Sequence, residues 1–71
     1  MEKKIVSDAR RYFNQLKRYC KKGDRWLAKR HLESLAGCWF AVQGGQAGYS
    51  LVKMLYHDGV HLFAETFGDE A

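Results

Sequence analysis

Residues 3–22 constrain the fold most, because their apolar and basic side chains separate completely when the segment is wound as a helix. At about 100° per residue, the apolar residues fall on an arc of roughly 140°, and the basic residues fall on the opposite arc. The apolar set is Ile5, Val6, Ala9, Tyr12, Phe13, Leu16, Tyr19 and Cys20. The basic set is Lys3, Lys4, Arg10, Arg11, Lys17, Arg18, Lys21 and Lys22. This pattern predicts an amphipathic helix over residues 3–22 that ends at Gly23.

A second helix is expected over residues 24–43, because Asp24 directly follows Gly23 and is a good N-cap residue. One face of this helix is apolar, and it continues on both sides of the single Gly37. It consists of Leu27, Ala28, His31, Leu32, Leu35, Cys38, Trp39 and Val42. Since only Gly23 and the cap separate the two helices, they are expected to form an antiparallel hairpin.

The last third of the chain permits two interpretations. Asp58–Gly59 between apolar segments is typical of a two-residue β-hairpin, which would place strands near residues 50–57 and 60–67. Few residues there are β-branched, however, and the apolar spacing fits helices over residues 46–57 and 60–67. The favoured fold class is therefore all-α, as one small domain over residues 1–71, and the alternative is α+β. Residues 68–71 are expected to fray.

Size and apolar content together predict a homodimer. A chain of 71 residues with 46% hydrophobic residues, including four Phe, four Tyr and two Trp, can hardly bury them all by itself. A disulfide does not help, because Cys20 and Cys38 would lie roughly 18 Å apart along the helical hairpin, beyond the reach of a disulfide. Since no secretory leader is apparent and cysteines are few, cytoplasmic residence is expected.

The charge is distributed unevenly along the chain. Residues 1–33 carry a net charge of +7, and residues 34–71 carry −3, which gives the overall +4. Such asymmetry indicates an acidic partner for the first half, such as nucleic acid, an anionic membrane surface or an acidic protein surface. A membrane span is excluded, because the longest uncharged segment, residues 34–52, contains several polar residues and four glycines.

The basic arc of the first helix is the main candidate site. Its members form two stripes of like charge, Lys4–Arg11–Arg18–Lys22 and Lys3–Arg10–Lys17–Lys21, and Asp8 lies just outside the arc. A helix face that only meets water usually mixes acids with bases, because opposite-sign pairs stabilise it by about 0.2–0.5 kcal/mol each. The lack of acids on this arc therefore indicates that it binds phosphate or an acidic protein. The alternatives are an arc that only meets water and an arc that binds an anionic membrane. Asn14 and Gln15 could donate to phosphate oxygens.

Arg25, Trp26, Lys29 and Arg30 form a second candidate group at the start of the second helix. Trp26 lies off the apolar arc, where an indole beside cations can stack on an unpaired base. The ordinary alternative is a structural cation–π contact with its own neighbours.

Other chemistry is not indicated. His57 and His61 would be neighbours only on an unbroken helix, and Asp58–Gly59 argues against that, so no metal or other cofactor is expected. His31 is expected to be a core histidine with a hydrogen-bonded nitrogen. A helix-turn-helix arrangement is disfavoured, because its reading helix would carry only Gln46, Tyr49, Ser50 and Lys53 and the positive charge lies elsewhere.

These observations favour a non-catalytic binding module that contacts the nucleic-acid phosphate backbone through the first helix. The alternative is a small regulatory or inhibitory protein, of the kind that phages and other mobile elements encode, docking on an acidic protein surface. Binding to an anionic membrane surface is a weaker third hypothesis.

Overall fold

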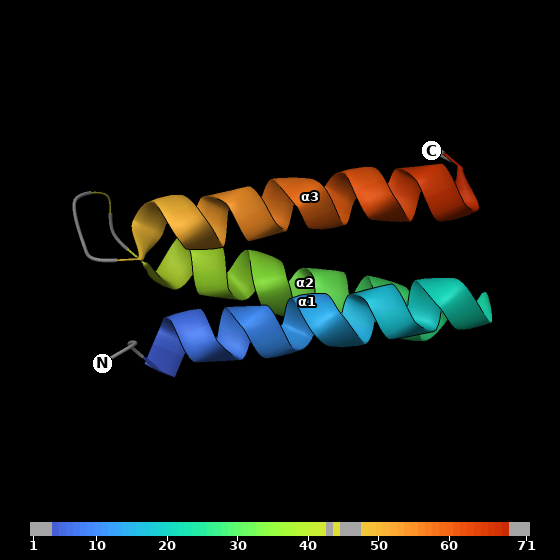
Figure 1. The fold of residues 1–71 in the computed structure, drawn as a ribbon, viewed down its shortest axis with the longest axis horizontal. Coiled ribbons are helices and arrows are strands. Elements are labelled where there is room, and N and C mark those ends of the chain that lie inside the picture. The colour runs from blue at the N-terminus through green and yellow to red at the C-terminus, as the bar shows by residue number, and fades with distance from the viewer. Residues whose placement is uncertain (1–3, 43, 45–47, 69–71) are drawn as a thin grey trace.

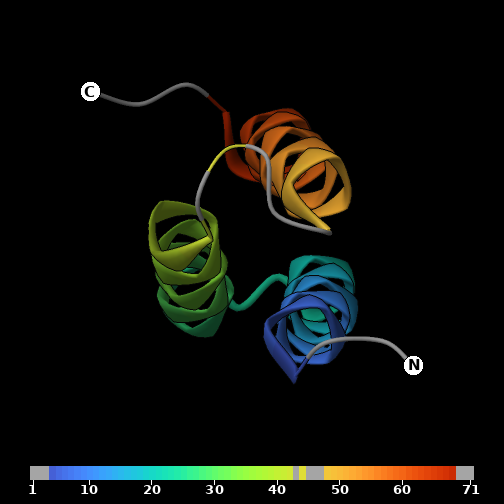
Figure 2. The same ribbon diagram turned by 90° about the vertical axis from the view of Figure 1, so that its left-hand side faces the viewer.

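Three helices form an up-down-up bundle in the computed structural model, which describes residues 4–42, 44 and 48–68. The helices are α1 (Lys4–Lys22), α2 (Arg25–Ala41) and α3 (Tyr49–Phe67). Each helix packs against both others, and the end-on view shows them at the corners of a triangle (Figures 1 and 2). The described residues contain no strand. The all-α prediction is therefore confirmed, and the β-hairpin alternative is wrong.

The turn between α1 and α2 follows the predicted glycine stop and cap. Gly23 adopts a left-handed φ of 76°. Its N–H donates to the Cys20 carbonyl at 3.1 Å, and the Asp24 N–H donates to the Tyr19 carbonyl at 3.0 Å, which is the Schellman arrangement. The Asp24 carboxylate then accepts a hydrogen bond from the Leu27 N–H at 3.1 Å, capping α2. These bonds fix the antiparallel hairpin.

α3 corrects the prediction of two separate elements over residues 46–57 and 60–67. It runs unbroken through Asp58–Gly59, and residues 46 and 47 lie outside the described residues. The reason is packing: a Cβ at Gly59 would lie only 2.9 Å from Leu16 Cδ2 and 3.2 Å from Leu35 Cδ2. Gly59 is thus the point at which α3 approaches α1 and α2 closely. The tail prediction falls mostly on residues 69–71, which are not described.

The core runs along the bundle axis and takes one fully buried large residue from each helix: Leu16, Leu35 and Val52. Val6, Ala9, Leu16 and Cys20 of the predicted apolar arc are all buried. Both cysteines are free, as predicted. None of the three helices is long and apolar enough to cross a membrane.

Candidate anion-binding surface

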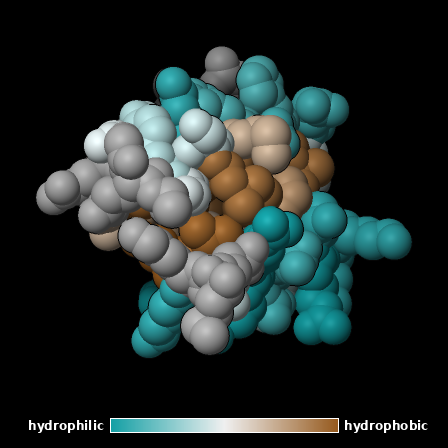
Figure 3. All heavy atoms as spheres, turned by 60° about the vertical axis from the view of Figure 1, so that its left-hand side comes forward, coloured by the Kyte–Doolittle hydropathy of each residue, from teal (hydrophilic) through white to brown (hydrophobic). Residues whose placement is uncertain are grey.

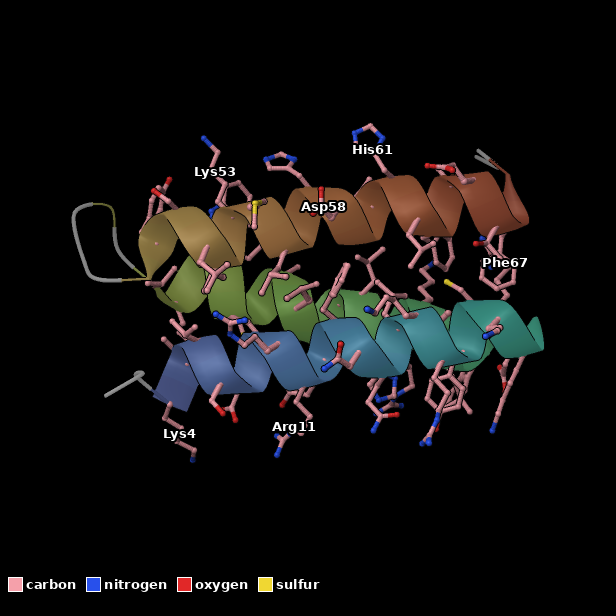
Figure 4. The ribbon with its side chains drawn as sticks, viewed as in Figure 1. Lys4, Arg11, Lys53, Asp58, His61 and Phe67 are labelled. Carbon is pink, nitrogen blue, oxygen red and sulfur yellow. The ribbon has the colours of Figure 1, made fainter. Side chains whose placement is uncertain are left out.

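The basic surface of α1 lies opposite the core. It is defined here by seven exposed side chains: Lys4, Arg10, Arg11, Lys17, Arg18, Lys21 and Lys22. Burial of Val6 and Leu16 fixes the rotation of α1, and this rotation turns the opposite arc to solvent. Figure 4 shows Lys4 and Arg11 pointing away from α3. Lys3 belongs to the predicted set but lies outside the described residues.

Aromatic rings support several of these cations. The Arg11 guanidinium lies 5.4 Å from the Tyr12 ring centroid, the Lys17 ammonium 5.2 Å from that of Phe13, and the Lys22 ammonium 5.8 Å from that of Tyr19. The rings belong to the half-buried rim of the core, so the aliphatic stems cover apolar surface while the charges stay in water. The same side chains therefore shield the core and present charge.

Asp8 is closer to this surface than the sequence indicated. It is the one acid between Lys4 and Lys22, and its carboxylate lies 3.5 Å from the Arg11 guanidinium. An exposed pair of this kind contributes little, typically about 0–1 kcal/mol. The acid sits at the edge of the basic surface and leaves its centre, at Arg18, cationic.

The second candidate group is brought together around an open hollow of about 440 Å³ on α2. Arg25, Trp26, Lys29 and Arg30 line it together with Glu33. The Trp26 side chain is 65% exposed, and the Arg30 guanidinium lies 5.1 Å from its ring centroid. The predicted cation–π contact is thus present, yet most of the indole remains accessible. Arg25 also leans toward α3, with its guanidinium 5.5 Å from the Phe63 ring centroid.

The three histidines differ in burial: His31 is half-buried, whereas His57 and His61 are exposed. His31 is half-buried between the Tyr12 and Tyr19 rings, and its Nδ1 lies 2.8 Å from the Leu27 carbonyl oxygen, as expected of a core histidine. His57 and His61 correct the sequence argument, because continuous α3 places them one turn apart, both exposed. Even so, no group of three or more His, Cys, Asp or Glu suited to a metal occurs among the described residues.

The two thiols are poor nucleophiles here. Burial raises the pKa of Cys20 above its ordinary value. Burial also raises the pKa of Cys38, and the nearby Asp8 carboxylate adds to the rise. A raised pKa keeps each thiol protonated at neutral pH, whereas a reactive cysteine requires the thiolate.

An exposed aromatic patch was not predicted. Phe40 is 78% exposed and stacks on Trp39, with ring centroids 5.5 Å apart. Trp39 also stacks on Tyr56 of α3 at 5.2 Å and contacts His57 at 5.8 Å. Helical spacing placed Trp39 on the apolar face, but it gave no signal for Phe40, which lies about 100° further round the helix.

Lys53 marks the opposite side of the molecule. It projects from α3 away from α1, on the side where His61 also projects (Figure 4). In the disfavoured helix-turn-helix arrangement α3 would be the reading helix, and Lys53 is the single Lys or Arg within it. Gln46 of that arrangement lies outside the described residues.

Comparison of the chain with protein-family models, with curated proteins and with solved structures finds no match.

Proposed function

We propose that the protein is a non-catalytic module that binds the phosphate backbone of nucleic acid through the basic surface of α1. The observation that carries the proposal is the gathering of seven exposed cations on one face of a single helix. Phosphates attract such a face without regard to base sequence, and release of counterions favours the complex. Weak sequence preference and steep salt dependence are therefore expected.

The dimensions of α1 suit a nucleic-acid backbone. Its 19 residues extend about 28 Å at about 1.5 Å per residue. Base-pair steps of B-DNA rise by about 3.4 Å, so the basic surface spans roughly eight of them and can contact the phosphates that face it. A chain of charges along the whole helix fits this periodic partner better than it fits one acidic spot on a protein.

The test is a titration of duplex and single-stranded DNA at two salt concentrations. Binding is expected to weaken by about tenfold or more at the higher salt, because several phosphate contacts are lost together. Arg11→Glu combined with Arg18→Glu should abolish binding, since it places acids at the centre of the surface. Fluorescence anisotropy of labelled DNA measures both effects.

A matched control separates local contact from overall charge. Arg18→Glu and Lys53→Glu change the net charge equally, but Lys53 lies on the opposite side of the bundle (Figure 4). Arg18→Glu should weaken binding strongly and Lys53→Glu only slightly. Failure of the wild-type protein to bind any DNA at low salt sinks the proposal. Recovery of an acidic protein by pull-down, or pelleting with anionic vesicles, would then favour one of the other partner classes.

We also propose that the protein is a homodimer in the cytoplasm. Exposed Phe40 and the half-buried rings of Trp39 and Tyr56 form an aromatic patch that a second copy would cover. A standard interface buries about 800 Å² per partner, which is roughly a sixth of the 4948 Å² surface. The two free cysteines fit a reducing compartment.

A further inference from the structure

Trp26 faces away from the core. Its side chain is 65% exposed, because Ala28, about 200° further round α2, lies on the completely buried side. The other tryptophan, Trp39, packs between Phe40 and Tyr56. Large aromatic side chains supply much of the apolar burial in a small core, and the Trp26 indole contributes little to it, so this ring is free to contact a partner.

The surroundings of Trp26 combine a flat ring with positive charge. Arg25, Lys29 and Arg30 line the same open hollow, which has a volume of about 440 Å³. The Arg30 guanidinium lies 5.1 Å from the indole centroid, on one of the two ring faces. The ring therefore stays available for stacking with a planar group whose neighbours are anionic.

A nucleotide has these two properties, and the hollow begins three residues after Lys22, the last residue of the basic surface. The Gly23 turn brings the start of α2 directly after Lys21 and Lys22. We propose that the hollow holds an unpaired base of a single-stranded nucleic acid, stacked on Trp26, with Arg25, Lys29 and Arg30 at the flanking phosphates. This inference rests on the proposed function, because the same strand continues along α1. It assigns the preferred substrate class as single strands, since a paired base does not offer its face.

Glu33 is the acidic side chain that lines the hollow, and it is proposed to set a preference among bases. Its carboxylate only accepts hydrogen bonds, and it lies on the rim two turns beyond Trp26. Cytosine presents an amino group at C4, which donates to such a carboxylate, whereas thymine presents an oxygen that repels it. Single strands of deoxycytidine should therefore bind more tightly than strands of thymidine.

The experiment compares Trp26→Ala with the wild-type protein on single strands of deoxycytidine, single strands of thymidine and a duplex of equal length. Stacking loss should weaken single-strand binding by about tenfold. Duplex affinity and the salt dependence should not change, because no phosphate contact is removed. Trp26→Tyr should restore most of the single-strand affinity. Wild-type preference for deoxycytidine should be about fivefold, and Glu33→Gln should remove it, because an amide both donates and accepts.

Met54→Ala is the control, since Met54 is an exposed apolar side chain on α3, outside both the hollow and the aromatic patch. It should leave all three affinities unchanged. If Trp26→Ala binds single strands as wild type does, or weakens single-strand and duplex binding equally, the stacking proposal is overturned while backbone binding stands. If the wild-type protein binds neither form at low salt, both proposals fail. Circular dichroism checks that each variant keeps its helices.

Discussion

At position 59, the lack of room for a side chain favours glycine, rather than a backbone conformation that only glycine adopts. A Cβ there would lie 2.9 Å from Leu16 Cδ2, 3.2 Å from Leu35 Cδ2 and 3.3 Å from Leu32 Cδ1. Alanine gains about 1 kcal/mol of helix propensity, but overpacking typically costs about 1–3 kcal/mol. Because Leu16 and Leu35 are completely buried and must shift to admit the Cβ, Gly59→Ala should destabilise the protein by about 1 kcal/mol in urea unfolding.

Gly37→Ala is the control for this prediction. Gly37 also lies inside a helix, but it is exposed, and a Cβ there meets nothing within 4 Å. Only helix propensity acts at this position, so the substitution should stabilise the protein by roughly 0.5–1 kcal/mol. Equal stabilisation by both substitutions would contradict the close approach of α3 to α1 and α2.

Gly59 also explains why the prediction of two separate elements from the sequence failed. Asp58–Gly59 has the local form of a hairpin turn, and the residues that select a helix there, Leu16, Leu32 and Leu35, are distant in the sequence. The exposure of Phe40 depends on the same kind of information, namely how the helices are rotated against one another. Single-residue properties do not contain it.

At the scale of the element, α1 and the α1–α2 turn were predictable because their signals are local. Eight apolar and eight basic residues separate on one helix, and a glycine and a cap residue follow at once. The basic surface could therefore be predicted residue by residue, because it is the complement of a buried arc. The hollow around Trp26 was predictable as a group, but its shape and the position of Arg30 over the ring depend on side-chain placement.

The N-terminus of α2 provides a test at this scale. Asp24→Ala removes the acceptor for the Leu27 N–H and should destabilise the protein by about 1 kcal/mol in thermal or urea unfolding. Asp58→Ala is the control, because it removes the same charge from an exposed position inside α3. It should be neutral or slightly stabilising, since alanine is the better helix former. A loss at Asp58 as large as that at Asp24 would mean that charge, not capping, matters.

The whole molecule separates charge from apolar surface. Figure 3 shows hydrophobic side chains exposed in the middle of one face, with hydrophilic side chains above and below. Lys and Arg residues gather on α1 and the first half of α2. In contrast, α3 carries one of them, Lys53, and two acids, Asp58 and Glu65. The aromatic patch of Phe40, Trp39 and Tyr56 joins α2 to α3, so a second copy seated there would leave the basic surface of α1 open.

This geometry makes the dimer testable independently of nucleic-acid binding. The mass in solution should be about twice 8.2 kDa, and Phe40→Glu should lower it to that of one chain, because a buried carboxylate without a partner is costly. Met54→Glu is the control. Met54 is also exposed, but it is two positions from Tyr56 in the sequence and therefore points to another side of α3. Light scattering after gel filtration measures both variants. A wild-type monomer would refute the dimer. A monomeric Met54→Glu with a dimeric Phe40→Glu would move the interface to the other side of α3.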